Sequence, residues 1–119
     1  MKTIGIIGTR RRNTDNDFLL VEEASLKVFQ QGDRICSGKC PKGGDRFAVL
    51  LADFHNTPTL WFPADWQRYG RGAGFIRNTD IARESDVLIA CVAKDRTGGT
   101  EDTIIKWMQF HPSRPVILV

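Results

Sequence analysis

Residues 87–92 read Val87-Leu88-Ile89-Ala90-Cys91-Val92, an unbroken apolar run of strand length. A run of this kind predicts a strand that is buried on both faces of a sheet. Other apolar runs that predict strands occur at residues 3–8, 34–37, 58–62 and 115–119. Helices are predicted between them, over residues 14–31, 45–55 and 79–84 and over a last stretch in which Ile104, Trp107 and Met108 share one face.

The alternation of predicted strands and helices decides the fold class. A strand, a helix and a parallel strand join through a right-handed crossover, and such crossovers place helices on both faces of the sheet. The chain is therefore predicted to be an α/β protein of three layers, with five mainly parallel strands in the middle layer. Because it has 119 residues and no linker or repeat, residues 1–119 are predicted to form a single domain.

The composition limits the class of protein further. The chain is 41% hydrophobic and 26% charged, which is ordinary for a globular protein and argues against disorder. No apolar run approaches the length of a membrane span, and the first strand leaves no room for a signal peptide, so we expect a cytoplasmic protein without a membrane partner. A net charge of +3 favours anionic partners weakly.

The cysteines predict neither a disulfide framework nor a metal site. Cys36, Cys40 and Cys91 are odd in number and contain no CxxC pair, so a four-ligand zinc site is not expected, and no cofactor is expected either. Cys36 and Cys91 lie inside apolar runs, where a cysteine behaves as a small hydrophobic residue. We therefore predict that both are buried.

Loops that are rich in glycine and in lysine or arginine follow the predicted strands, at residues 8–13, 38–45, 70–80 and 94–100. Because the carboxyl ends of parallel strands meet at one edge of the sheet, these loops are expected to converge where ligands bind in open α/β folds. Helix starts and arginine side chains both bind phosphate or carboxylate groups. Each loop alone is more typical of a tight turn, but their convergence predicts an anion site.

Individual charged side chains in these loops allow more than one interpretation. Arg10 is closest to the end of the first strand, and we predict that it contacts the ligand. Arg11 and Arg12 are expected to belong to a solvated loop in which one arginine turns inward. Asp45 and Asp102 stand at or near helix starts, where a carboxylate also serves simply to cap N–H groups.

The longest irregular connection is predicted for residues 64–75. It carries Trp66, which like Trp61 and Trp107 is expected in the core or at an interface; stacking on a base is the alternative for Trp66 alone. The end of this connection combines three glycines with Arg71 and leads to Arg77, just before the helix that is predicted from residue 79.

Four blocks of the sequence resemble one family and keep its order along the chain: Ser37-Gly38 with Gly43-Gly44-Asp45-Arg46-x-Ala48, Phe62-Pro63-Ala64-Asp65-Trp66, Gly70-Arg71-Gly72-Ala73-Gly74-x-Ile76-Arg77-Asn78, and Gly99-Thr100-Glu101-Asp102. They resemble the small YspA/YpsA-like, single-domain branch of the SLOG superfamily over nearly the whole chain. The resemblance implies a Rossmann-like sheet with a pocket for nucleotides or nucleotide-derived ligands. The superfamily also includes the Lonely-guy phosphoribohydrolases, which cleave the N-glycosidic bond of nucleoside 5′-monophosphates, and the DNA-processing protein A group, which binds single-stranded DNA.

The resemblance also implies roles for particular residues. Arg77 matches the catalytic arginine of the phosphoribohydrolases, with asparagine in place of their following lysine. Ser37 and Asp45 would contact the sugar or the base, and Arg71 would contact a phosphate or a second subunit. The ligand-binding residues predicted in this way are Gly8, Thr9, Arg10, Ser37, Gly38, Asp45, Arg71, Gly98, Gly99 and Thr100.

The match to the phosphate-binding motif of these enzymes is partial. Gly99 and Thr100 keep its Gly-Thr step, but Thr103 stands where the enzymes have glutamate. Asp102 and Glu101, one or two positions earlier, are the candidates for the missing carboxylate. A carboxylate beside the sugar would stabilise its cationic transition state and activate water.

The predicted function is binding of a small nucleotide or nucleotide-derived ligand. Whether the protein also hydrolyses the N-glycosidic bond of a nucleoside 5′-monophosphate is left open at this point. The alternatives are a non-catalytic nucleotide sensor, a module whose pocket is vestigial, and a module that binds single-stranded nucleic acid. The mild charge and the absence of an aromatic run argue against the last. A homo-oligomer is also predicted, because so short a chain leaves one helix layer of the sheet thinly covered.

Overall fold

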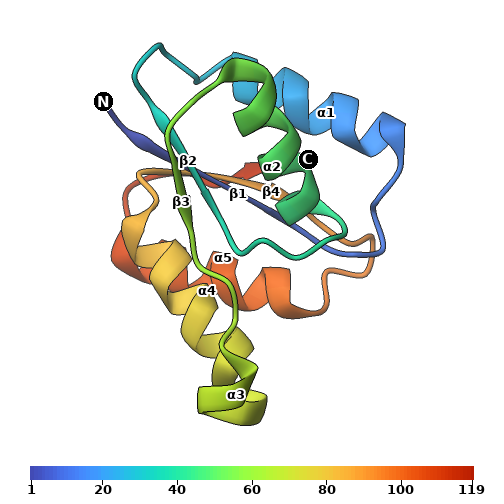
Figure 1. Cartoon of the computed structure of the whole chain (residues 1–119), viewed down its shortest axis with the longest axis vertical. Coiled ribbons are helices and arrows are strands. Elements are labelled where there is room, and N and C mark those ends of the chain that lie inside the picture. Colours follow the sequence, from blue (N-terminus) through green and yellow to red (C-terminus); the bar gives the residue numbers. More distant parts are fainter.

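The computed structural model describes residues 1–119 and contains one five-stranded sheet in the order β3-β2-β1-β4-β5. All four pairs of neighbouring strands are parallel. The strands are β1 (Thr3–Gly8), β2 (Arg34–Ser37), β3 (Thr59–Trp61), β4 (Val87–Cys91) and β5 (Ile117–Leu118). The predicted Rossmann-like α/β fold with a five-stranded parallel sheet is therefore confirmed (Figure 1).

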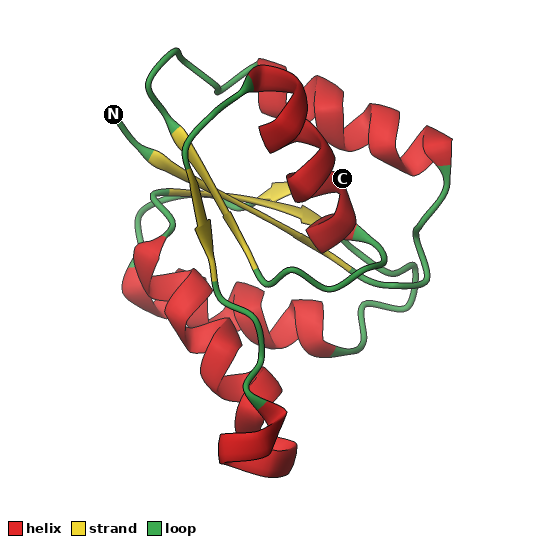
Figure 2. Cartoon of the chain, viewed as in Figure 1, coloured by secondary structure: helices red, strands yellow, loops and turns green.

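Two pairs of helices cover the two faces of the sheet, as Figure 2 shows. On one face α1 (Asp15–Leu26) and α2 (Gly44–His55) contribute Val21 and Phe47 to a buried cluster that includes Ile4 and Ile6. On the other face α4 (Ala73–Glu84) and α5 (Gly99–Phe110) pack Ile81, Ile104 and Trp107 against Ile7, Leu88 and Ala90. Successive residues of a strand point to opposite faces, so a sheet covered on both sides needs continuous apolar runs.

The buried cysteines behave as predicted. Cys36 and Cys91 are both fully buried and belong to the clusters on opposite faces of the sheet. Burial raises the pKa of the Cys36 thiol to about 12, so this thiol stays protonated at neutral pH. Both side chains therefore serve the core.

The segment after β3 is the main departure from the sequence-based expectation. Residues 64–75 are not an irregular connection: α3 (Trp66–Tyr69) and a 3₁₀ turn (Gly70–Gly72) precede α4, which begins at Ala73 instead of residue 79. Glycines lower helix propensity, and this hid the start of α4. Tertiary packing outweighs that cost, because Ala73 and Asn78 are both buried.

Two smaller expectations are also wrong. The first helix ends at Leu26 instead of near residue 31, and turns follow in which Val28 and Phe29 donate backbone hydrogen bonds to Ser25. Met108 does not share the buried face of α5, since its side chain is 52% exposed. Ile104 and Trp107 are three residues apart and point to the core, whereas the residue after Trp107 is turned about 100° away from it. None of the helices combines the length and apolar content needed to cross a membrane.

Candidate functional site

A cleft of about 350 Å³ opens at the carboxyl edge of the sheet, and we call it the first cleft. Chain order reverses there: β1 leads outward to β2 and β3, whereas β4 on its other side leads to β5. Open α/β sheets bind ligands at this switch point. The first cleft is lined by Ile7, Gly8, Thr9, Arg10, Arg11, Cys40, Asp45, Arg77, Asn78, Ile81, Thr97, Gly98, Gly99, Thr100 and Thr103.

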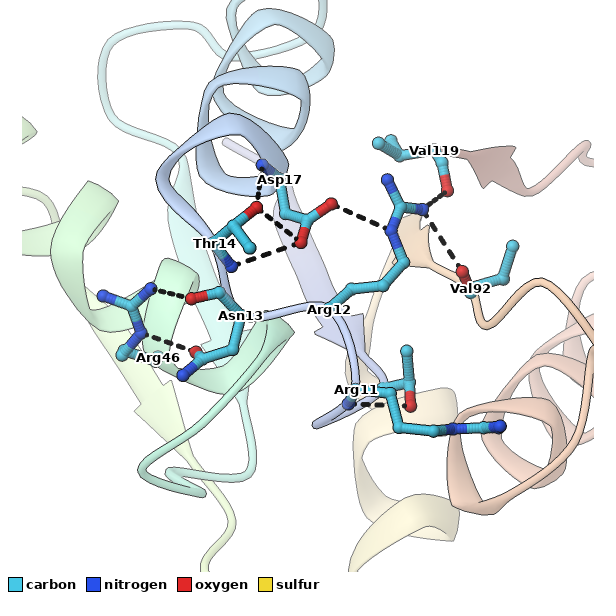
Figure 3. Close-up of polar contacts among 9 residues, drawn as sticks. Arg11, Arg12, Asn13, Thr14, Asp17, Arg46, Val92 and Val119 are labelled. Atoms are coloured by element: carbon cyan, nitrogen blue, oxygen red, sulfur yellow. Dashed lines mark hydrogen bonds and ion pairs between the residues drawn. The ribbon is translucent and has the colours of Figure 1, made fainter.

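The loop between β1 and α1 is held by Arg12, which is the arginine that turns inward (Figure 3). Its Nη1 donates hydrogen bonds to the carbonyl oxygens of Val119 at 2.6 Å and Val92 at 3.2 Å, and its Nε donates to Asp17 at 3.0 Å. Burial alone would raise the pKa of Asp17, but hydrogen bonds from Thr14 and Arg12 lower it. Because Thr14 and Asp17 also form the capping box of α1, one network fixes the loop, the helix and the edge of the sheet.

Arg11 connects the two loops at the switch point. Its guanidinium donates two hydrogen bonds of 2.9 Å to Asp95 and one of 3.1 Å to the carbonyl of Thr97, in the loop between β4 and α5. Hydrogen bonds from Arg11 and Thr97 hold the pKa of Asp95 well below its usual range. Arg10, by contrast, makes no hydrogen bond or ion pair within the protein, is exposed, and lines the first cleft.

The start of α2 packs directly on the end of β1. A Cβ at Gly44 would fall on backbone atoms of Ile7 and Gly8, so only glycine allows this approach. The N–H of Gly43 donates to Asn13 Oδ1 at 2.9 Å. Arg46 Nε donates to the same oxygen at 2.8 Å (Figure 3). These contacts place Asp45, the second residue of α2, beside the first cleft.

Asp45 is the carboxylate that the fold presents to the first cleft. Its oxygens accept hydrogen bonds from the Ser37 hydroxyl at 2.8 Å and from the N–H of Cys40 at 3.0 Å. Ser37 is fully buried, and its hydroxyl also contacts the carbonyl of Ile6 at 2.5 Å. Ser37 therefore orients Asp45 and does not itself line the first cleft.

Arg77 lies opposite Asp45, with Nη1 at 3.7 Å from Asp45 Oδ2. It donates to the carbonyl of Gly38 at 3.4 Å and to Asn78 Oδ1 at 3.1 Å. A Cβ at Gly38 would collide with the Arg77 guanidinium and with Asp45, so the glycine leaves the space in which this pair meets. Asn78 in turn donates to the carbonyl of Gly99 at 3.3 Å and thereby ties α4 to the start of α5.

The start of α5 forms another part of the lining of the first cleft. Its N-cap residue Gly98 provides no side-chain cap, so N–H groups of the first turn remain available to a ligand. The two carboxylates of this turn point elsewhere: Glu101 pairs with Arg96 at 2.9 Å and Asp102 with Lys106 at 2.8 Å. These pairs neutralise the negative charges that would otherwise repel an anion from the helix start.

The structure brings together most residues that the sequence singles out. Gly8, Thr9, Arg10, Asp45, Arg77, Gly98, Gly99 and Thr100 all line the first cleft. Ser37 and Gly38 lie behind Asp45 and Arg77, as described above.

Three predicted site residues lie outside this group. Arg71 is exposed in the 3₁₀ turn and lines neither the first cleft nor the smaller one beside it. Glu101 and Asp102 are also absent from both linings; Asp102 accepts a hydrogen bond from Asn78 at 3.1 Å between α4 and α5.

Sequence reasoning missed Arg11, Cys40, Asn78 and Thr97 as cleft residues. Asn78 follows Arg77 directly and was the most accessible of them to motif reasoning. Arg11 gave no signal that set it apart from its arginine neighbours. No group of three or more His, Cys, Asp or Glu side chains in the structure could hold a metal ion.

No protein-family model and no curated protein matches the chain. Among solved structures, the molybdenum cofactor binding protein from the phototrophic bacterium Rippkaea orientalis is similar, with a TM-score of 0.71. The similarity covers 98% of this chain and 75% of that chain, at 20% sequence identity. At this identity the likeness concerns the fold, and it agrees with the Rossmann-like architecture described above.

Proposed function

We propose that the protein binds a nucleotide or nucleotide-derived small molecule in the first cleft, with a phosphate group at the start of α5. The observation that carries this proposal is the uncapped N-terminus of a 12-residue helix at the switch point, faced by Arg77 and by the unpartnered Arg10. An uncapped helix start binds phosphate through its N–H groups and its dipole. Asp45 is placed to accept a hydrogen bond from a ribose hydroxyl or a base amine.

The resemblance to the SLOG superfamily supports the same ligand class. Residues of three of its four sequence blocks meet around the first cleft: Asp45, Arg77, Gly99 and Thr100. Membership of the YspA/YpsA-like branch is part of the proposal and rests on these residues.

Hydrolysis of an N-glycosidic bond receives less support from the geometry than binding does. The two carboxylates expected to assist it, Glu101 and Asp102, are held by Arg96 and by Lys106 and Asn78. Asp45 is the carboxylate that lines the first cleft. We therefore propose a binding protein first, with turnover as a separate question.

Thermal unfolding with added ligand tests the proposal. The panel contains the nucleoside 5′-monophosphates, NAD, ADP-ribose and the molybdenum cofactor named for the structural neighbour. A ligand at about a hundred times its dissociation constant should stabilise the protein by about 2.7 kcal/mol. Arg77→Ala should abolish the shift, whereas Arg83→Ala, an exposed arginine on the same helix, should leave it intact. Absence of a shift with every ligand would contradict the proposal.

Turnover and nucleic-acid binding need separate readouts. Chromatography after incubation detects free base, and Asp102→Asn should leave any such activity unchanged if Asp102 serves only to join the helices. A single-stranded oligonucleotide should bind, if at all, with an affinity that falls steeply with salt, whereas a mononucleotide site saturates with one small ligand.

Self-association remains part of the proposal. Phe75 and Ile105, on α4 and α5, are 58% and 57% exposed, and apolar side chains of this size favour contact with a second copy. Light scattering on the purified chain measures its mass in solution, and a monomer at micromolar concentration would contradict the proposed self-association.

A further inference from the structure

A smaller cleft of about 220 Å³ adjoins the first one, and we call it the second cleft. It is lined by Arg10, Gly38, Lys39, Cys40, Pro41, Pro63, Ala64, Trp66 and Arg77. Arg10, Cys40 and Arg77 line both clefts, so the two clefts meet at these three side chains, which we call the junction. A molecule that extends past the junction would contact both clefts.

The second cleft is positively charged, and of the cations in its lining only Arg77 has a carboxylate partner, Asp45 of the first cleft. No carboxylate lines the second cleft, whereas Arg10, Lys39 and Arg77 all do. Arg10 has no polar partner in the protein, and the Lys39 ammonium makes no ion pair and lies 6.0 Å from the centre of the Trp61 ring. Lys39 also adopts a left-handed backbone conformation with φ of 60°, which is uncommon for a residue other than glycine. An unpaired cation at the junction, Arg10, and another in the second cleft, Lys39, suit an anionic group that is bound there.

Apolar side chains complete the lining of the second cleft: Pro41, Pro63, Ala64 and Trp66. Trp66 is 55% exposed, whereas Trp107 is fully buried in the core. Trp66 is the first residue of α3, and Asp65 caps this helix: its carboxylate accepts a hydrogen bond from the N–H of Arg68 at 3.1 Å. Figure 1 shows α3 projecting beyond the end of α4, on the carboxyl side of β3. An exposed indole beside two prolines offers a surface on which a planar ring can stack.

We propose that the ligand is a dinucleotide-type molecule, in which a nucleotide in the first cleft is joined through phosphates to a second ring that stacks on Trp66 in the second cleft. Arg10 and Arg77 contact the linking phosphates. Small-molecule sites usually measure about 300–1,000 Å³, so the first cleft alone, at about 350 Å³, is at the small end of that range. This inference rests on the proposed nucleotide binding and names the class of nucleotide.

Calorimetric titration with matched ligands tests it. For each of the four bases, the probes are the nucleoside 5′-monophosphate and the dinucleoside 5′,5′-diphosphate made from two copies of it. For the base that binds, we expect the wild-type protein to bind the dinucleotide at least about tenfold tighter than the monophosphate, an effect in the range of one base stacked on an aromatic ring. Trp66→Ala should remove this preference and leave the affinity for the monophosphate within about twofold.

Two further variants separate stacking from general damage. Phe54→Ala removes an aromatic side chain that is 78% exposed on α2 and lines neither cleft, so it should keep the preference. Lys39→Ala should lower the affinity for the dinucleotide and leave the affinity for the monophosphate unchanged, because Lys39 lines only the second cleft.

The outcomes distinguish this inference from the proposed function. Equal affinities for both members of every pair in the wild-type protein, or a preference that survives in Trp66→Ala, would overturn the dinucleotide assignment and leave mononucleotide binding standing. Failure of all eight probes to bind would overturn the dinucleotide assignment, and it would overturn the proposed function as well if no ligand of the thermal-unfolding panel stabilises the protein.

Discussion

Two helices of this protein begin with the same pair of residues and have opposite surroundings. Gly43-Gly44 opens α2 and Gly98-Gly99 opens α5; the first glycine of each pair has a positive φ, 73° and 107°, and neither helix has a side-chain cap. Gly43 and Gly44 are buried, and Gly98 and Gly99 are exposed. The α2 start packs on the backbone of β1, whereas the α5 start faces the first cleft.

The difference teaches that a glycine pair before a helix does not by itself indicate a phosphate site. At α2 the N–H of Gly43 already has a protein acceptor in Asn13 Oδ1, so the pair serves the close approach of helix and strand. At α5 the side chains nearest the first turn, Glu101 and Asp102, are paired with Arg96 and Lys106. Gly98 and Gly99 line the first cleft, whereas Gly43 and Gly44 do not, so of the two glycine pairs only the second lies beside the proposed ligand.

The largest expected effect is the difference in stability between two variants that each add a methyl group at one of the helix starts. Gly44→Ala forces a Cβ onto the backbone of β1, which cannot move without breaking the sheet, and should lower the free energy of unfolding by about 3 kcal/mol. The Cβ added by Gly99→Ala would meet nothing closer than Asn78 Nδ2 at 3.9 Å. This variant should change the free energy of unfolding by less than about 0.5 kcal/mol. Urea denaturation measures both, and similar losses would mean that the two starts are equally packed.

A smaller effect is expected where the two helix starts meet the arginine between them. Gly38→Ala should push Arg77 away from Asp45 and the first cleft, because its Cβ would overlap the guanidinium. We expect nucleotide affinity to fall about tenfold, which corresponds to about 1.4 kcal/mol. Gly72→Ala, where a Cβ meets open space, is the matched control. Unchanged affinity in Gly38→Ala would show that Arg77 does not need its present position.

Asn13 is the residue that closes the α2 start. Asn13→Ala leaves the buried N–H of Gly43 without its acceptor and should cost about 1 kcal/mol of unfolding free energy. Asn16→Ala, an exposed position in the first turn of α1, should cost less and serves as the control. If the two variants unfold alike in urea, the N–H of Gly43 finds another partner.

The smallest effect concerns the contact between Arg11 and Asp95, which joins the loop after β1 to the loop after β4. Asp95→Asn weakens the double hydrogen bond to Arg11, but the pair is exposed, and exposed ion pairs contribute little to stability. The expected result is faster amide hydrogen exchange in residues 94–98 with an almost unchanged melting temperature. Exchange as slow as in the wild-type protein would show that Arg11 does not restrain this loop.

The sequence by itself determined the sheet and the edge at which the site lies. Apolar runs such as residues 87–92 are local patterns, and a strand buried on both faces needs no distant residue to be recognised. Parallel strands bring every loop that follows a strand to one edge, which predicts that Gly8, Asp45 and Gly99 lie there, and all three line the first cleft. Burial of Cys36 and Cys91 follows from the same runs.

Only the tertiary structure decided which side chains face the first cleft and where α4 begins. Ala73 extends the helix through a glycine-rich segment because it packs against the core, and local propensity contains no record of that contact. Asp102 turns to Asn78 and Lys106, whereas Asp45 is held towards the first cleft by Ser37 and Cys40. Except for the pair with Lys106 one turn along α5, these partners lie on other elements of the fold. In the sequence, Asp45 and Asp102 look alike, because each is a carboxylate near a helix start. Only the contacts between elements show that Asp45 lies at the first cleft and that Asp102 joins two helices.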